Sequence, residues 1–227
     1  MPDVNAGSPR ASSVSLSRRL RDATSDEHDS AERHGFTRAL LEGRVPLSGY
    51  AEMVAQHYFV YAALEETAAE LADDPIVGTL LSPALDRVPA LERDLEALHG
   101  PGWRGRVTPG PTTAAYADHI RRTAARPSGY VAHHYTRYLG DLSGGRFIGR
   151  AVQRAYGLRD GHGVGFYDFG ELGSLPRFKK GYRARLDALP LPEAEIRHTL
   201  DEARLSYRFS TGLLADLGRG LPPELVA

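Results

Sequence analysis

The spacing of apolar positions along the chain predicts helices and no strands. From residue 16 to residue 42 the apolar side chains recur at roughly helical spacing, and Gly43 follows them as a C-terminal glycine should. The same periodicity predicts further helices over residues 50–73, 89–99, 114–125, 128–156, 174–189 and 192–217. Neither strand alternation of useful length nor a solenoid repeat is present. We therefore expect an all-α fold.

Proline and glycine mark the connections between these helices. They predict a turn over 43–49, a connection with short helical turns over 74–88, a loop over 103–112 and an ordered loop over 157–173. Residues 1–14 combine Pro, Gly and Ser without a long apolar run, which predicts a disordered tail and no signal peptide. The folded unit expected from these boundaries is one helical domain over 15–220.

Composition narrows the classes of function. A chain of 227 residues with 41% hydrophobic and 25% charged residues suits a single globular domain. Its net charge of −1 argues against nucleic-acid binding. The absence of cysteine excludes disulfides, thiolate-ligated heme and cysteine-based metal sites, and it fits a cytoplasmic protein. No window reaches the roughly 18 apolar residues of a membrane span, so we expect no membrane anchor.

A cluster of glycines lies inside one predicted helix. Gly140 and Gly144 stand at i and i+4, so they leave a strip of helix without Cβ atoms. Such a strip accommodates either a flat rigid ligand on the backbone or a closely packed second helix. Asp141 and Ser143 bring polar groups to its edge. The spacing alone leaves both interpretations open.

His28 and a basic pair also allow two interpretations each. Thr24, His28 and Glu32 share a helix face beside small residues, so His28 is either a buried histidine or a metal ligand whose Nδ1 proton Glu32 accepts. The spacing alone favours the first. Lys179 and Arg183, at i and i+4, can bind two carboxylates at the rim of a pocket or form a solvated face.

Other candidate motifs carry less weight. Two Glu-x-x-His pairs, Glu96–His99 and Glu195–His198, lie away from the apolar stripes of their helices, so we expect both at the surface. His133 and His134 are adjacent and point to different faces, so they do not form a paired ligand set. No Gly-x-Ser-x-Gly, Walker or dinucleotide motif is present.

The wording of residues 135–145, Tyr-Thr-Arg-Tyr-Leu-Gly-Asp-Leu-Ser-Gly-Gly, closely resembles the distal-helix motif of the heme oxygenases. The similarity covers roughly residues 16–217 and includes the segments 21–28 and 58–66. The resemblance implies a soluble, bacterial-type, biliverdin-producing enzyme. Its fold would be a multi-helix bundle with heme between a first helix and the glycine-kinked distal helix.

The resemblance also assigns roles to individual residues. His28 would be the proximal ligand of heme iron, with Glu32 as its partner. Tyr61, Arg137 and Asp141 would form the distal hydrogen-bond network on the face that Gly140 and Gly144 leave open. The remaining heme contacts would be Arg21, Tyr135, Lys179 and Arg183 at the propionates, together with Ser143 and Tyr207. Ser25 and Ser210 replace residues that some relatives have near the propionates and the distal network, which bears on heme affinity.

The function implied is oxidative cleavage of heme to biliverdin, carbon monoxide and ferrous iron. Heme would be substrate and prosthetic group, O2 a co-substrate, and a ferredoxin or flavoprotein reductase the external electron donor of a monomeric enzyme. The alternative is a non-enzymatic heme carrier, which would have no evident need for Tyr61, Arg137 and Asp141. Thiamin-degrading or di-iron enzymes of related fold would need a pocket cysteine or inward carboxylates, and the sequence offers neither.

Overall fold

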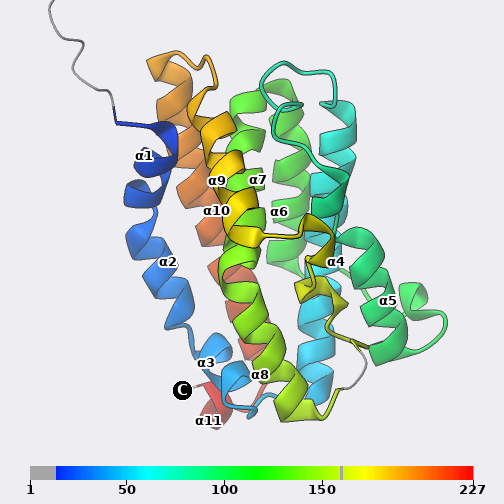
Figure 1. The fold of residues 1–227 in the computed structure, drawn as a ribbon. Coiled ribbons are helices and arrows are strands. Elements are labelled where there is room, and N and C mark those ends of the chain that lie inside the picture. The colour runs from blue at the N-terminus through cyan, green and yellow to red at the C-terminus, as the bar shows by residue number, and fades with distance from the viewer. Residues whose placement is uncertain (1–13, 159–160, 227) are drawn as a thin grey trace, which may run out of the picture.

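The computed structural model describes residues 14–158 and 161–226, and its regular elements are all helical (Figure 1). The centre of the bundle consists of α4 (Leu47–Glu70), α6 (Pro111–Arg122), α7 (Pro127–Gly140) and α10 (Glu193–Arg219). α10 packs along α7 and α6, and α4 packs against α6 and α5 (Val88–His99). The all-α fold expected from the sequence is confirmed for the described residues.

The expectation of a single helix over 16–42 is wrong. The structure has three helices there: α1 (Leu16–Ala23), α2 (Ser25–Glu32) and α3 (Gly35–Leu41). Thr24 leaves the helical region with φ −119° and ψ 9°. The Nδ1 atom of His34 accepts the N–H of Phe36 and caps α3. α2 has no buried residue, so no core packing holds the three segments in one line. They run along one edge of the bundle, next to α9 (Leu175–Asp187), α10 and α8 (Arg146–Tyr156) (Figure 1).

The glycine-rich helix expected over 128–156 forms as α7, a π-helical segment η4 (Asp141–Gly145) and α8. A π-helical turn inserts an extra residue into the helix, and such turns are common at functional sites. The predicted kink is therefore present, and it coincides with the glycines.

The remaining helices follow the expected pattern with small shifts at their ends. Short 3-10 turns occupy the connections: η1 (Pro83–Leu85), η2 (Trp103–Gly105), η3 (Thr123–Ala125), η5 (Gly165–Tyr167) and η6 (Gly170–Leu172). The C-terminal α11 (Pro223–Val226) was not expected. Residues 1–13 of the expected tail lie outside the described residues. Within the described chain, no helix combines the length and apolarity needed to cross a bilayer.

Tyrosines that are both buried and hydrogen-bonded fix the rotation of the central helices. The Tyr130 hydroxyl donates to the carbonyl of Leu64 at 2.9 Å, and the Tyr182 hydroxyl lies 2.8 Å from Nδ1 of His134. A buried tyrosine that satisfies its hydroxyl in this way specifies both packing and orientation. These two bonds attach α7 to α4 on one side and to α9 on another.

Candidate functional site

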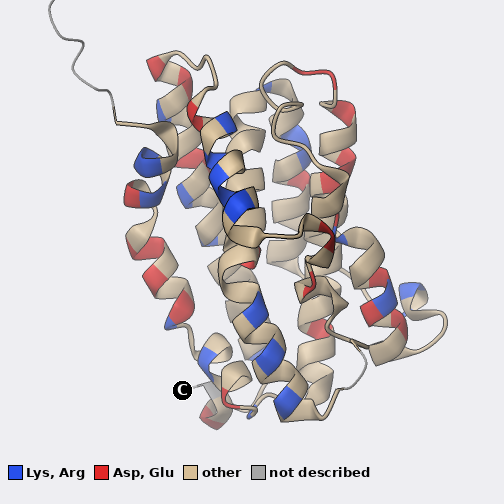
Figure 2. Ribbon diagram, viewed as in Figure 1, with Lys and Arg blue, Asp and Glu red and all other residues tan. Residues whose placement is uncertain are grey.

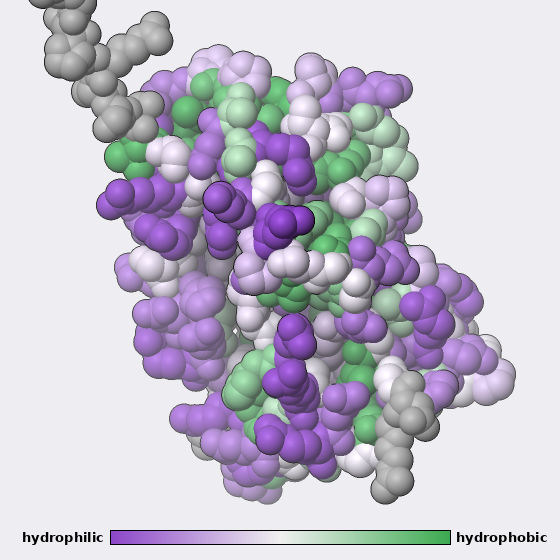
Figure 3. All heavy atoms as spheres, viewed as in Figure 1, coloured by the Kyte–Doolittle hydropathy of each residue, from purple (hydrophilic) through white to green (hydrophobic). Residues whose placement is uncertain are grey.

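A cleft lies between the α1–α2 edge and the α7, η4 and α10 helices, and it contains two adjoining cavities. The outer cavity has a volume of about 760 Å³ and is lined largely by α1, α2 and α7. The inner cavity has a volume of about 480 Å³ and reaches η4, α4 and the 166–167 turn. The two share the lining residues His28, Thr136, Gly140, Ser143 and Tyr207. Figure 3 shows a groove in the surface between α2 and the helices α7 and α8.

The glycines of this helix serve two different purposes. A Cβ placed on Gly140 or Gly144 would meet no atom within 4 Å, so their backbone faces open space. A Cβ on Gly145 would lie 3.3 Å from the Tyr167 side chain, and one on Gly149 would lie 3.0 Å from it. Close packing therefore explains Gly145 and Gly149. Gly140 and Gly144 instead form an open strip in the wall of the cleft, which suits a flat ligand.

His28 of α2 lines both cavities, across the cleft from this strip. Its side chain is 50% exposed. Nε2 lies 3.6 Å from Glu32 Oε1, and Nδ1 lies 3.7 Å from Asp29 Oδ1. Both separations exceed hydrogen-bonding distance, so the imidazole is free to ligate a metal.

The pairing expected between Glu32 and Nδ1 of His28 is wrong. Glu32 lies one turn further along α2, nearer to Nε2, and the Nδ1 side of the ring faces Asp29. The reason is that a helical side chain leans toward the N-terminus of its helix, so a residue at i+4 reaches back over the ring. Glu32 nevertheless lines the inner cavity.

The structure brings Tyr61, Arg137 and Asp141 together at the inner end of the cleft. The Tyr61 hydroxyl donates a hydrogen bond to Oδ2 of Asp141. The Arg137 guanidinium lies 5.1 Å from the centre of the Tyr61 ring and donates to Oγ of Ser210 at 3.3 Å. Burial raises the pKa of Asp141 well above the usual carboxyl range and lowers the pKa of Arg137. Asp141 is consequently placed to hold a proton inside the cavity.

His57, which no sequence motif singled out, lines the inner cavity from α4. Burial, and then the charge of Arg137, lower the pKa of His57 to about 3, so its imidazole is neutral. Its Nδ1 atom is buried without a hydrogen-bond partner, as is Nε of Arg137. His57 stands one helical turn before Tyr61, and that spacing could have revealed it. Unpaired buried polar atoms at a cavity call for water or a ligand.

The outer cavity has a basic rim. Arg21, Tyr135 and Arg183 line it, whereas Lys179 lies at its edge and donates from Nζ to Oγ of Ser143 at 3.4 Å. Figure 2 shows Lys and Arg gathered along α9. The ring of Tyr207 lies edge-on to His28 at 6.2 Å, and burial raises the Tyr207 pKa to about 12. The structure thus places all thirteen expected site residues in or beside the cleft.

A second depression, of about 810 Å³, lies between α5, α8 and the loop that ends in η6. Its lining includes neither His28 nor the open glycine strip. The chemistry expected from the sequence therefore belongs to the cleft and not to this larger hollow.

The chain as a whole matches one known protein family. The family model described as heme oxygenase matches residues 14–216. The chain belongs to the heme oxygenase family. The expected enzymatic activity, heme oxygenase activity, therefore stands, and the non-enzymatic carrier is not favoured.

Relatives of this heme oxygenase family cover nearly the whole chain. Heme oxygenase 1 of Synechocystis sp. is 38% identical over 206 residues, which are 90% of this chain and 85% of that protein. The structure of heme oxygenase-1 from Synechocystis sp. in complex with heme has a TM-score of 0.87 at 37% identity and covers 94% of this chain and 95% of that one. Heme oxygenase-2 of Synechocystis sp. in complex with heme and NO has a TM-score of 0.88 at 32% identity, covering 93% and 90% of the two chains.

Proposed function

We propose that this chain cleaves heme oxidatively to biliverdin, carbon monoxide and ferrous iron, using O2 and electrons from an external reductant. The observation that carries the proposal is the open strip at Gly140 and Gly144, which faces a cleft with a free histidine on its other side. A flat macrocycle with a central metal and acidic edge groups suits this combination of strip, imidazole and basic rim. Bound heme would supply the iron at which oxygen is activated and would itself be the molecule that is cleaved.

His28 is the proposed iron ligand. Its ring has no hydrogen bond that competes for either nitrogen, and it opens into both cavities. Lys179 and Arg183 of α9, with Arg21 of α1 and Tyr135 of α7, are the proposed partners of the propionates. Charged and hydroxyl donors at a partly exposed rim can orient two carboxylates without burying them.

Proton transfer on the side of the cleft opposite His28 is proposed to depend on Tyr61, Arg137 and Asp141. The raised pKa of Asp141 favours a protonated carboxyl group, and the Tyr61 hydroxyl fixes its orientation. From that position Asp141 can hold a water in the inner cavity and pass it a proton. The unpaired atoms of His57 and Arg137 offer further anchors for such a water. Gly140, Gly144 and Ser143 leave space beside it.

The electron donor is proposed to be a ferredoxin or a flavoprotein reductase, since the described residues provide no second redox group and the chain has no cysteine. A docking surface for such a donor requires only charge complementarity. We propose a monomeric enzyme of the cytoplasm, and the lack of cysteine fits a reducing compartment.

The test is a single-turnover experiment with the purified full-length chain and one equivalent of hemin. After ascorbate is added under air, we expect the heme absorption to decay and biliverdin and carbon monoxide to appear together. Hemin that binds but persists under these conditions would contradict the proposal and support a carrier.

The assignment of His28 has its own variant. His28→Ala should abolish the histidine-ligated spectrum of the hemin complex and reduce turnover to background. His162→Gln removes an exposed histidine away from the cleft and serves as the matched control. A hemin spectrum that is the same for His28→Ala and the parent would remove His28 from the site.

A further inference from the structure

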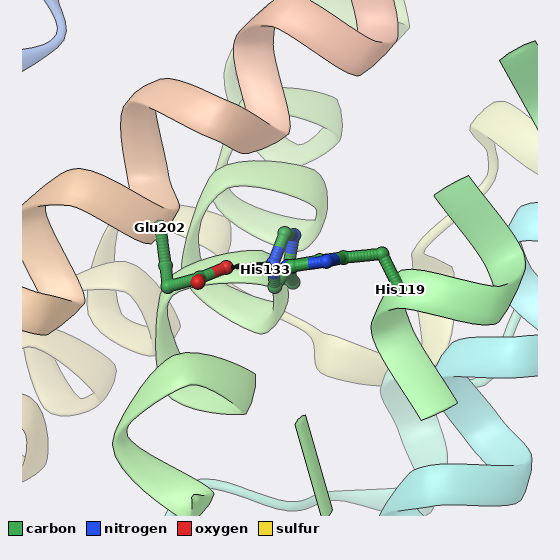
Figure 4. Close-up of side chains that lie close together, drawn as sticks. All are labelled: His119, His133 and Glu202. Atoms are coloured by element: carbon green, nitrogen blue, oxygen red, sulfur yellow. Dashed lines mark hydrogen bonds and ion pairs between the residues drawn. The ribbon is translucent and has the colours of Figure 1, made fainter. Parts of the chain in front are cut away.

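Three side chains on three different helices converge outside the heme cleft. They are His119 of α6, His133 of α7 and Glu202 of α10 (Figure 4). Nε2 of His119 lies 2.7 Å from Oε2 of Glu202, and Nε2 of His133 lies 2.9 Å from the same oxygen. One ligand atom from each of the three residues lies within 4.8 Å of the other two. None of the three lines either heme cavity.

We propose that His119, His133 and Glu202 form a binding site for a divalent first-row transition cation. Two imidazole nitrogens and one carboxylate oxygen are a donor set that Zn²⁺, Fe²⁺ and Co²⁺ accept and that Mg²⁺ and Ca²⁺ do not prefer. The site is distinct from the heme iron site, and it does not depend on the function proposed for the cleft.

The outer contacts of His133 direct its Nε2 toward the cluster. His133 is fully buried, and its Nδ1 lies 3.3 Å from the hydroxyl of Tyr116. That hydroxyl is in turn 2.7 Å from Oγ of Ser206. A hydrogen bond at one ring nitrogen that fixes the direction of the other is the usual support of a histidine ligand. His133 therefore presents Nε2 at a fixed position.

The cluster is also accessible from solvent. The side chains of His119 and Glu202 are 21% and 13% exposed. This partial exposure gives a cation an entry path and allows water to complete its coordination. His198 lies close by, one turn before Glu202 on α10, because a Cβ on Gly129 would lie 3.2 Å from His198 Nε2 and 3.6 Å from Glu202 Cγ. It is not among the residues whose ligand atoms lie within 4.8 Å of one another, so water would complete the coordination.

His198 was expected at the surface, facing away from the core. The structure places it partly buried beside Gly129 of α7, where the missing side chain lets α10 approach. Its sequence partner Glu195 accepts hydrogen bonds from Arg126 and Ser128 and does not join the cluster. The Glu-x-x-His spacing therefore has no part in the proposed site as a pair.

Metal binding requires a change of tautomer and a small movement of the Glu202 side chain. Each Nε2 must give up the proton it now donates to Glu202, and the neutral ring then carries its proton on Nδ1, which for His133 lies beside the Tyr116 hydroxyl. Bonds of about 2.0–2.2 Å to the cation would set the N···O separations at about 3.0–3.4 Å. The carboxylate must therefore retreat by about 0.5 Å from the imidazoles, which are now its hydrogen-bond donors. In the competing interpretation the three residues form only a hydrogen-bonded network between helices, and no cation binds them with useful affinity.

Co²⁺ is the probe that separates these interpretations, because its visible absorption reports coordination number and ligand type. The full-length chain is titrated without heme in a His28→Ala background, which removes the exposed His28, Asp29 and Glu32 group as a second candidate. We expect one Co²⁺ to bind per chain and to give visible absorption bands. Added Zn²⁺ should displace the Co²⁺ and abolish these bands. Failure to bind a stoichiometric Co²⁺ would overturn the proposal.

His119→Gln is the principal variant, because this side chain is partly exposed and its loss leaves the core intact. Loss of a supporting contact costs a metal site about 10–100-fold in affinity, so loss of this ligand should weaken Co²⁺ binding by about 100-fold. His162→Gln, at an exposed histidine outside the cluster, should leave the affinity unchanged. Equal affinity for parent and His119→Gln would overturn the assignment. Glu202→Gln, which keeps the side-chain shape, provides the same test if His119→Gln does not fold.

Discussion

Asp141 shows how its surroundings set the chemistry of a single carboxyl group. It lies at the start of the π-helical segment, where burial raises its pKa and the Tyr61 hydroxyl donates to one of its oxygens. No cation is bonded to it among the described residues, since the Arg137 guanidinium turns to Ser210. Asp141 therefore differs from an ordinary surface carboxylate in holding its proton more tightly, because burial disfavours the charged form.

Replacement of Asp141 should separate binding from turnover. Asp141→Ala leaves His28 and the basic rim intact, so hemin should still bind. Biliverdin formation should nevertheless fall by about 100-fold, the usual contribution of a positioned proton donor. Asp141→Asn should be milder because an amide still anchors water. Single-turnover spectroscopy with ascorbate measures both steps, and biliverdin formation at the parent rate in Asp141→Ala would show that the carboxyl group serves only packing.

The raised pKa of Asp141 also predicts a pH dependence of stability. The folded chain holds this proton more tightly than the unfolded chain does, so the stability contributed by Asp141 is present at low pH. It is lost as the pH rises from the ordinary carboxyl range through the raised pKa. Asp141→Asn removes this loss, so the ligand-free variant should unfold at a higher temperature than the parent at neutral pH. Thermal unfolding at pH 4 and pH 7 tests this, and a difference independent of pH would contradict it.

At the residue scale, the sequence could predict which residues gather at the cleft, but not which atoms of their side chains meet. His28, Tyr61, Arg137 and Asp141 could be named because they stand within recognisable motifs. The tilt of the Glu32 side chain depends on local helix geometry, and the importance of His57 depends on which face of α4 meets the cavity. Neither is visible in a one-dimensional string. His119, His133 and Glu202 lie far apart in sequence and meet only through the packing of three helices.

At the element scale, the glycines of α7, η4 and α8 could be predicted as a group but not sorted individually. Spacing allowed both a ligand-binding strip and close helix packing, and the structure uses glycine for both purposes. Which glycine serves which purpose is decided by Tyr167, whose ring packs on Gly145 and Gly149 from a distant loop. The breaks that separate α1, α2 and α3 were equally hidden, because they reflect the absence of core packing around α2.

Two glycine variants should therefore have opposite effects on the ligand-free protein. Gly144→Ala adds a methyl group in open space and should stabilise the helix by about 0.5–1 kcal/mol while weakening hemin binding. Gly149→Ala forces a methyl group to 3.0 Å from Tyr167. It should cost about 1–3 kcal/mol and leave the hemin affinity of the folded protein unchanged. Urea unfolding and hemin titration measure both quantities, and tighter hemin binding by Gly144→Ala would refute the role of the strip.

α2 should be the helix most affected by the ligand. It carries His28 yet buries no side chain, so little holds it closed in the ligand-free protein. If hemin is bound through His28, opening of α2 requires release of hemin. At a free hemin concentration 100 times the Kd, amide protection in α2 should then rise by about 100-fold. Hydrogen exchange of α2, compared with α5 outside the cleft, tests this; similar gains in both helices would argue against ligation from α2.

At the scale of the whole molecule, the outer wall of the cleft is held by contacts distant in sequence. The backbone N–H of Ser17 donates to Asp187 at 2.7 Å, and Arg19 donates to both oxygens of Glu193 at 2.9 and 2.7 Å. Arg204 donates to the carbonyl of Ala23 at 3.1 Å, at the end of α1. These bonds attach α1 to the last two long helices. The outer wall of the cleft is therefore complete only when α9 and α10 have packed against α1.

Although the net charge of the chain is close to zero, basic side chains gather at the rim of the outer cavity, and we expect them to control the orientation of heme. The basic rim is assembled from α1, α7 and α9, so it exists only in the complete fold. Each exposed charge contact contributes about 0.2–1 kcal/mol. Reversing two of them in Lys179→Glu/Arg183→Glu should shift the balance between heme orientations by about 1–2 kcal/mol.

The product reports that orientation directly. The parent should form mainly the α isomer of biliverdin, because all four proposed rim positions are filled. The double variant should release a mixture that includes the β or δ isomer, since a rotated heme offers a different ring edge to the distal side. Lys180→Glu changes the same charge at an exposed neighbour that does not line the cleft, so it should keep the α isomer. Chromatography of the bilins decides the matter: if the double variant gives only the α isomer, the walls of the cavity and not its charged rim set the orientation of heme.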